Sequence, residues 1–294
     1  MTDYVVVDVF TDTPLAGNPL AVIPDARALG EDRLQAIARE FNLSETAFVF
    51  PAAHASHDAR VRIFTPAEEL PFAGHPNVGT AFALAHAGAV LGRPVGERLR
   101  FEEGAGVVLA DLLREEGVVV GASVRAPLGL ALGPERPAAA VAALARLPAS
   151  AILARTHPPR YASVGTGFLL AETTRDALEQ ATPDPEAFRG EAAHAPGGHL
   201  PALYLWADMG RQGAVAQVEA RMFAPLAGVI EDPATGSAAA ALGALLAAAG
   251  VADRLSVRQG RLMNRPSTID IAARSDGIWI SGRCAMVAQG RLLA

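Results

Sequence analysis

The chain has 294 residues, of which 51% are hydrophobic and 5% aromatic, and its formal net charge is -6. This length exceeds the usual size of one compact domain, and the apolar content is enough for sizeable cores, so two domains are expected. All 25 basic residues are arginine and they are scattered, which excludes imine chemistry on a protein lysine and argues against a nucleic-acid surface. The expected partner is a small molecule.

The single cysteine and the apolar runs indicate the compartment. Cys284 has no second cysteine with which to form an internal disulfide, which fits a reducing compartment. The first residues show no basic stretch followed by a long apolar segment, so no targeting peptide is visible. Apolar runs such as residues 237–251 contain glycine and are shorter than the roughly 18 to 20 residues that a membrane span needs. A cytoplasmic protein without a membrane partner is therefore expected.

Taken in chain order, the first half is mainly a set of strands. Segments rich in β-branched or aromatic residues and bounded by turn formers predict strands over residues 5–10, 20–23, 46–50, 60–64 and 117–125. Apolar and polar spacing predicts peripheral helices over residues 31–41, 138–147 and 175–181. Two further segments, residues 77–87 and 237–249, are apolar or small on all sides. Each of these two predicts a central, fully buried helix that strands can approach closely.

A proline- and glycine-rich stretch near the middle of the chain, residues 126–137, predicts a linker. It separates an N-terminal domain over residues 1–127 from a C-terminal domain over residues 128–294. The final strand, expected over residues 278–288, belongs either to the second domain or, by returning, to the first.

Two motifs occur twice in the same order, about half a chain apart. Arg-x-Phe-x-Pro begins at Arg62 and again at Arg221, and Pro-x-x-Gly-Ser/Thr-Ala follows directly after His75 and again after Asp232. Such a long period predicts two similar domains rather than a solenoid, whose repeats span roughly 20 to 50 residues. Each half is then a set of strands wrapped around one apolar helix.

The entrances of the two central helices are candidate anion sites. A helix N-terminus offers free N–H groups and the positive end of its dipole. If the halves close on a cleft, both entrances can hold a substrate carboxylate and stabilise charge that develops on it. Gly236 and Ser237 are the expected contacts, with Gly79 and Thr80 as their counterparts. The alternative is that these pairs only begin helices and permit tight packing.

Glu45 is the best candidate for proton transfer at carbon, which requires a titratable group whose pKa lies near neutrality. It stands directly against the apolar strand over residues 46–50. Burial there would raise its pKa and prepare it to act as base and then as acid. Local context alone favours a solvated glutamate at the strand entrance, and only the resemblance described below reverses that preference.

His75 and Asp232 occupy matching places in the two halves, so in a closed cleft both would face one substrate. One is basic and one acidic, which suits a site that handles different ends of a molecule. The alternatives are a helix-capping Asp232 and a structural His75 bonded to the backbone. The other histidines lack a nearby cysteine or carboxylate cluster and Gly165-Thr166-Gly167 lacks a third glycine, so neither a metal nor a nicotinamide cofactor is expected.

The chain resembles the phenazine-biosynthesis isomerase-like family, whose fold is similar to that of diaminopimelate epimerase. The matching segments are spread in the family's order over residues 7–11, 17–22, 42–48, 64–69, 72–76 and 232–237. The resemblance implies an α+β fold of two pseudo-symmetric domains, each an open barrel-like β-sheet wrapped around a central apolar helix. It also implies an active site in the cleft and a homodimer.

For the site, the resemblance implies that Glu45 moves a proton from one carbon of the substrate to another. His75, Asp232 and Ser237 are implied to hold the substrate's polar groups, and Asn18 and Gly74 lie in matched segments and are expected to contact it. In the epimerase relatives two cysteines take the places of His75 and Asp232, so their absence argues against thiol racemisation.

The sequence therefore predicts a cofactor-independent isomerase of a small carboxylated substrate, with phenazine synthesis as only one of its pathways. An amino-acid epimerase and a non-catalytic ligand-binding protein remain open alternatives. The chain departs from the family at Arg258-Gln259-Gly260, where Glu-Gln-Gly is common, and at Asn264, where glycine is common. Both departures are expected to lie away from the chemistry.

Overall fold

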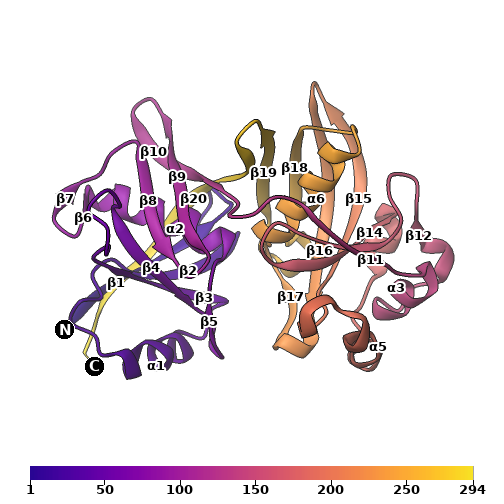
Figure 1. Cartoon of the computed structure of the whole chain (residues 1–294), viewed down its shortest axis with the longest axis horizontal. Helices are drawn as coiled ribbons and strands as arrows, with labels where there is room; N and C mark the ends of the chain where they lie inside the picture. The colour runs from indigo at the N-terminus through magenta and orange to yellow at the C-terminus, as the bar shows by residue number, and fades with distance from the viewer. Residues whose placement is uncertain (294) are drawn as a thin grey trace. The chain divides into compact units, whose positions relative to one another are not determined.

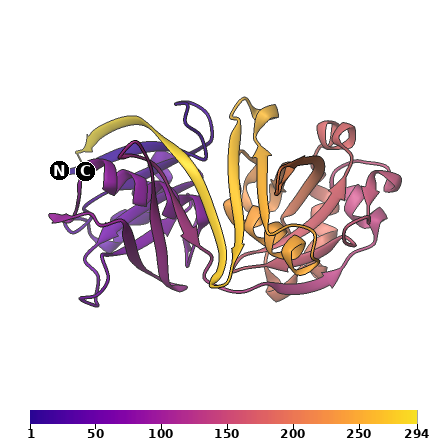
Figure 2. The ribbon, with the colours of Figure 1, turned by 90° about the horizontal axis from the view of Figure 1, so that it is seen from above.

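The computed structural model describes residues 1–293, and the chain divides into two compact units. The first unit is Met1–Pro127 together with the chain from Ile280 onward, and the second is Leu128–Trp279. Strand β20 (Gly277–Leu292) carries the chain from the second unit back into the first, where it pairs with β1 (Thr2–Val9) (Figures 1 and 2). The final strand therefore belongs mainly to the first unit.

In the first unit the strands form a closed ring. They pair in the order β20–β1–β2–β3–β4–β8–β9–β10, and β10 pairs again with β20. This arrangement confirms a barrel-like sheet around a central helix. The elements of this unit, besides β1 and β20, are β2 (Asn18–Ile23), α1 (Glu31–Phe41), β3 (Glu45–Phe50), β4 (Ala59–Phe64), β5 (Glu69–Leu70), α2 (Gly74–Ala87), β6 (Ala89–Val90), β7 (Arg93–Pro94), β8 (Arg98–Glu103), β9 (Gly106–Glu115) and β10 (Val118–Arg125).

Helix α2 is the centre of the ring, and every residue from 74 to 84 is buried. A helix that is apolar or small on all sides has no face suited to water, so the strands enclose it. Gly79 shows how closely they approach, because a Cβ atom there would lie 2.7 Å from both Leu20 and Val9. The expected central, small-residue helix is confirmed in this unit.

The second unit is built around helix α6 in the same manner. Its strands pair in the order β11–β13–β14–β15–β16–β18–β19, and a Cβ atom on Gly243 of α6 would lie 2.5 Å from Ile271. None of the helices within residues 1–293 is both long and apolar enough to cross a membrane. The elements are β11 (Ala131–Glu135), α3 (Ala138–Leu144), β12 (Ile152–Leu153), β13 (Arg160–Ser163), β14 (Gly167–Thr173), α4 (Arg175–Gln180), α5 (Pro185–Glu191), β15 (Leu203–Gln212), β16 (Val215–Ala224), β17 (Val229–Asp232), α6 (Gly236–Ala248), β18 (Arg254–Gln259) and β19 (Ser267–Arg274), with short 3-10 turns at Ala149–Ala151, Ala192–His194, Pro196–Gly198, Pro225–Ala227 and Arg261–Met263.

The two units repeat one pairing scheme. The run β1–β2–β3–β4–β8–β9 and the run β13–β14–β15–β16–β18–β19 share the same succession of antiparallel and parallel pairs. Their register also agrees, because Thr46 pairs with Phe64 in the first unit and Leu203 pairs with Phe223 in the second. The internal duplication seen in the motifs is therefore a duplication of structure.

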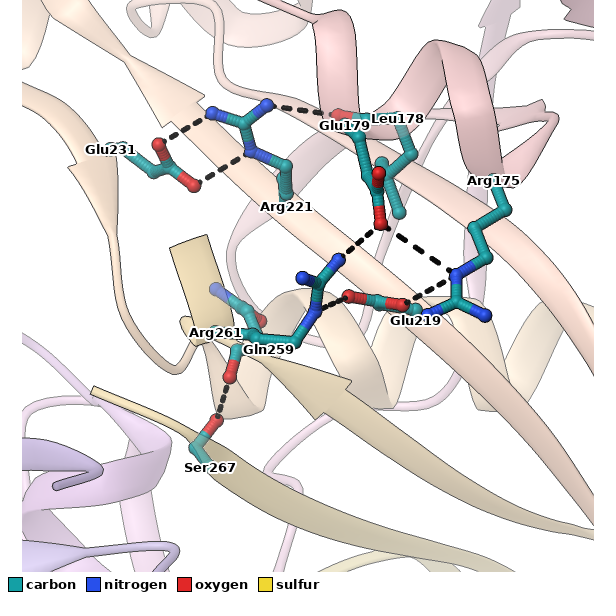
Figure 3. Close-up of polar contacts among 9 residues, drawn as sticks. All are labelled: Arg175, Leu178, Glu179, Glu219, Arg221, Glu231, Gln259, Arg261 and Ser267. Carbon is teal, nitrogen blue, oxygen red and sulfur yellow. Dashed lines mark hydrogen bonds and ion pairs between the residues drawn. The ribbon is translucent and has the colours of Figure 1, made fainter. Parts of the chain in front are cut away.

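The repeated Arg-x-Phe motif ties each β-sheet to the short strand that precedes its central helix. Arg62 donates two hydrogen bonds of 2.7 Å to Glu69, and Arg221 donates two of 2.8 Å to Glu231 (Figure 3). Each guanidinium also lies over the phenylalanine two residues later. Bidentate arginine–carboxylate pairs are directional, so they fix the direction in which the chain enters the helix.

Some expectations about individual elements were wrong. Residues 131–135 of the expected linker form strand β11, which pairs with β13. Strands β8 and β9 were not foreseen; in β8, charged residues alternate with the only two buried positions. Helix α3 ends at Leu144 and not at residue 147, since Arg146 adopts a positive φ of 53°. A left-handed backbone there cannot continue a right-handed helix.

Candidate active site

The first unit brings Glu45 and His75 together. Glu45 is the first residue of β3, and His75 is the second residue of α2. Their side-chain atoms Oε2 and Nε2 lie 3.2 Å apart, and the side chains are only 16% and 6% exposed. The solvated-glutamate alternative therefore does not hold for Glu45, because a tertiary contact covers it.

His75 is a neutral imidazole at neutral pH. Burial lowers the pKa of His75 to about 3, because a charged ring would lose its hydration. Although 3.2 Å is an ion-pair distance, the contact therefore joins Glu45 to an uncharged ring. Nε2 of His75 is buried and not aligned for a regular hydrogen bond. In a neutral imidazole one nitrogen donates and the other accepts a hydrogen bond, and a change of tautomer exchanges the two roles, so this pair can rearrange around a ligand.

The N-terminus of α2 adjoins this pair. Ala73 is the N-cap residue and makes no side-chain cap, and the first turn holds no acidic residue. The N–H groups of Gly74 and His75 therefore belong to the first turn, where a helix has no internal acceptor for them. Such a turn attracts anions through its dipole.

Gly79 and Thr80 do not belong to this turn, which corrects the expectation that they match Gly236 and Ser237. They are the sixth and seventh residues of α2, so their N–H groups lie within the intrahelical hydrogen-bond ladder. Both are buried, and Gly79 faces strands β1 and β2. The sequence match placed the helix start too late, because His75 and Pro76 already lie inside the helix.

Asn18 lies near Glu45 in the sheet. It is the fully buried first residue of β2, and β2 runs parallel to β3 with Leu20 opposite Glu45. The preceding Gly17 has a φ of +61°, and a Cβ atom there would lie 2.3 Å from the Val9 carbonyl oxygen. Glycine is therefore required at the turn that delivers Asn18 to this end of the sheet.

In the second unit Asp232 ends β17 and lies in a polar turn before α6. It is 7% exposed, and its Oδ2 accepts a 2.5 Å hydrogen bond from the Thr235 hydroxyl. Thr235, and not Asp232, is the N-cap residue of α6, whose first two residues are Gly236 and Ser237. Gly236 and Ser237 thus do offer first-turn N–H groups, as expected. The matched sequence motifs therefore begin their helices at different points.

Gln259, the last residue of β18, holds this turn in place. Its Nε2 donates to the Asp232 carbonyl oxygen at 2.8 Å and to the Thr235 hydroxyl at 3.0 Å. Its Oε1 accepts from the Thr235 N–H at 3.2 Å and from the Tyr204 hydroxyl at 3.3 Å. All four hydrogen-bonding positions of the carboxamide are thereby used, which fixes its orientation.

The backbone of Gln259 is anchored as well. The Ser267 hydroxyl lies 3.2 Å from the carbonyl oxygen of Gln259 (Figure 3). It lies at the same distance from the carbonyl oxygen of Pro233. Burial raises the pKa of the Tyr204 phenol, and the nearby Asp232 raises it further, so Tyr204 remains a hydrogen-bond donor. The sequence patterns alone did not assign Gln259, Thr235 and Tyr204 to the site. The recurring Glu-Gly and Gln-Gly strand ends at Glu103 and Gln259 are the signal that could have revealed them.

Glu45 has no counterpart in the second unit. Phe64 and Phe223 are equivalent through the repeated motif, so their strand partners Thr46 and Leu203 are equivalent too. The residue before Leu203 is Ala202, which therefore stands where the first unit has Glu45. Within residues 1–293 no group of three or more His, Cys, Asp or Glu side chains is arranged to hold a metal ion.

Known proteins share first the fold of this chain and then its family. A hydroxyproline epimerase from Agrobacterium vitis shares the fold, with a TM-score of 0.64 at 13% identity over 98% of this chain and 91% of that one. A phenazine biosynthesis protein of the PhzF family from Bacillus anthracis gives a TM-score of 0.85 at 25% identity, over 100% and 99% of the two chains. A trans-2,3-dihydro-3-hydroxyanthranilate isomerase from Pseudomonas aeruginosa is 37% identical over 300 residues, which cover 99% of each chain.

The α+β, epimerase-like fold class is thereby confirmed. The family model for phenazine biosynthesis-like proteins matches residues 7–290, and the chain belongs to that family. The protein is an isomerase, as three relatives that match it over nearly their full length are named.

Proposed function

We propose that this isomerase moves a proton between two carbons of a small carboxylated substrate, with Glu45 as the group that carries the proton. The contact between Glu45 and the neutral, buried His75 is the observation that carries the proposal. A carboxyl group in a largely buried site can take a proton from carbon and return it, because water does not compete for it.

We infer the following steps. The Glu45 carboxylate removes a proton from one carbon, and the electron pair of that C–H bond moves into the substrate's unsaturated system. The first-turn N–H groups of α2, at Gly74 and His75, stabilise the negative charge that develops. Protonated Glu45 then returns the proton to a second carbon, so the double bond shifts and no cofactor is consumed.

In the second unit we propose that Asp232, Gly236 and Ser237 bind polar groups of the substrate. Asp232 is held by Thr235 and Gln259, and Gly236 and Ser237 lie in the first turn of α6. We expect Ser237→Ala to raise KM more than it lowers kcat, because it removes a binding contact and no proton carrier. A fall in kcat alone would contradict this assignment.

The presence of Ala202 in place of a second glutamate supports a single proton carrier over a racemase with two equivalent carboxylates. The relative from Pseudomonas aeruginosa is named for isomerising trans-2,3-dihydro-3-hydroxyanthranilate, so this compound is the first substrate to test. Other small amino and hydroxy acids follow it in the same assay.

The test is turnover in D2O, followed by NMR and mass spectrometry, for the wild type, Glu45→Gln and the exposed control Glu40→Gln. We expect a shifted double bond with the wild type and Glu40→Gln only, and deuterium at carbon to the extent that the carried proton exchanges with solvent. Deuterium at one carbon without a change of constitution would indicate an epimerase instead. Binding by calorimetry without turnover or exchange, in both wild type and Glu45→Gln, would indicate a ligand-binding protein.

We also propose that the isomerase needs no cofactor and acts as a homodimer. Activity should survive dialysis against a metal chelator, and light scattering should give twice the chain mass of 30.4 kDa. Loss of activity that a metal salt restores, or a monomeric mass at assay concentration, would contradict the respective part.

A further inference from the structure

Glu103 and Gln259 occupy equivalent places at the ends of β8 and β18. Ala59 pairs with Phe101, and Val218, its equivalent through the repeated motif, pairs with Val257. Glu103 and Gln259 each follow two residues later, and a glycine comes after both. One unit therefore has a carboxyl group where the other has a carboxamide.

The carboxamide and the carboxyl differ in how well they are satisfied. Gln259 uses all four of its hydrogen-bonding positions on the turn before α6. Both carboxyl oxygens of Glu103 and Oδ1 of Asn77, in the first turn of α2, are buried, and none of the three makes a well-aligned hydrogen bond. Buried polar atoms left unpaired are costly, so two such groups on neighbouring side chains require an explanation.

A single proton on Glu103 satisfies both groups. The Asn77 side chain lies within hydrogen-bonding range of the Glu103 carboxyl, while its Nδ2 donates to the Ala73 carbonyl oxygen at 2.9 Å. A protonated carboxyl can donate to Oδ1 and accept the second N–H of the same carboxamide. Burial raises the pKa of Glu103 to about 8, and Asn77 opposes this rise only in part.

We propose that Glu103 is a positioning residue that acts as a neutral carboxylic acid, donating to Asn77 and thereby fixing the Ala73–His75 turn beside Glu45. Gln259 performs the equivalent task for the turn at Asp232 with a permanently neutral amide. The role in catalysis rests on the proposed function, whereas the protonation of Glu103 does not. Ionisation of Glu103 would replace the donor by a second acceptor and loosen the turn that carries His75.

No charged side chain is among the influences on the pKa of Glu103. Burial is the main influence on its pKa, and α2 presents the neutral His75. Strand β9 places Gly106 opposite it. Glu103 is one of the residues that line a depression of about 620 Å³. The other charged residues that line it are Arg60 and Arg62 on β4, Glu69 on β5 and Glu102 on β8. Arg62 is engaged with Glu69, and Glu102 with His57.

The first experiment needs no substrate. The full chain is labelled with ¹³C in the glutamate carboxyl groups and ¹⁵N in the histidine rings, and NMR follows pH 5 to 10 in wild type, Glu103→Gln and the exposed control Glu116→Gln. We expect one glutamate carboxyl to titrate near pH 8 in the wild type and the control and to be missing in Glu103→Gln. The His75 ring signals should shift over the same pH range wherever that carboxyl is present.

Either of two results would overturn the proposal. One is that every glutamate carboxyl titrates well below neutral pH or that the high-pH signal persists in Glu103→Gln. The other is that the His75 signals do not follow that titration. Because no turnover is measured, these results remain distinct from a failure of the proposed isomerisation.

Kinetics then test the positioning role. In the wild type, kcat should fall by roughly tenfold as pH rises through 8, whereas Glu103→Gln should hold kcat within about twofold over the same range. Glu103→Leu, which cannot donate, should show a low kcat at every pH with KM changed little. An alkaline fall that is unchanged in Glu103→Gln would assign the pH dependence to another group and overturn the role.

Discussion

The two units have the same strand pairings and the same kind of central helix. Within residues 1–293, however, the pair that we propose to move the proton, Glu45 and His75, lies in the first unit. The position equivalent to Glu45, which lies beside His75, is Ala202 in the second unit. The entrance of α6 holds the Asp232 turn instead. The comparison teaches that duplication preserved what a barrel-like sheet requires, namely the Arg–Glu tie and the small-residue helix. The polar residues near the helix entrances were free to diverge, because they do not hold the sheet together.

The sharpest test of this difference between the units is to remove the Glu45 carboxylate. Glu45→Gln should lower kcat/KM by about 10²- to 10⁴-fold, since the amide cannot accept a proton from carbon. Steady-state kinetics on the first substrate that turns over checks this, with the exposed Glu40→Gln as control. Comparable activity in both variants would place the proton carrier elsewhere.

The glycines after the equivalent strands should differ strongly in their tolerance of alanine. Gly260 has a φ of +76°, and a Cβ atom there would lie 2.3 Å from the Arg265 carbonyl oxygen and 2.5 Å from that of Pro233. Gly260→Ala should lower the free energy of unfolding by roughly 3 kcal/mol through backbone strain and overlap.

Gly104 is the matched control. A Cβ atom there would lie 3.1 Å from its nearest neighbour, Pro71 Cα, and the φ of Gly104 is not positive. Gly104→Ala should cost about 1 kcal/mol or less. Urea unfolding measures both variants, and equal losses would mean that the two strand ends are not distinguished by these contacts.

The equivalence of Glu103 and Gln259 can be tested by placing the carboxyl in the second unit. Gln259→Glu should lower the free energy of unfolding by about 2 kcal/mol at pH 7, because an ionised carboxyl cannot donate to the Asp232 carbonyl oxygen or the Thr235 hydroxyl. The loss should grow with pH. A variant as stable as wild type at pH 8 would show that the amide donors are dispensable.

The smallest expected effect comes from the reverse change, Glu103→Gln. The pKa of Glu103 is about 8 when folded, above its usual 4.5, so the folded protein keeps a proton that the unfolded chain releases between these pH values. Wild-type stability should therefore fall as pH rises from about 4.5 to 8, and Glu103→Gln should remove that fall.

The gain in Glu103→Gln should be about 1 to 2 kcal/mol at pH 8, below the full linkage value because part of the residue is exposed. Thermal unfolding from pH 5 to 9 measures it. A difference between the two proteins that does not vary with pH would contradict a buried, protonated Glu103.

Short-range patterns in the sequence were enough to predict the duplication and several helices. The repeated Arg-x-Phe-x-Pro motif disclosed the duplication, and the all-apolar segments located α2 and α6 to within a few residues. Helix α1 has the expected ends, because its spacing of apolar residues is regular. The resemblance to a family supplied Glu45, which local context alone would have left in solvent.

Only the tertiary structure decided the rest, since burial and long-range pairing are not written in local spacing. It made His75 a neutral neighbour of Glu45, moved Gly79 from the expected anion site into the helix–sheet contact, and joined β20 to the first unit. It also placed Gln259 beneath the Asp232 turn across a large separation in sequence. Hydrogen bonds and desolvation depend on which distant groups meet, and that is settled only when the sheets close around their helices.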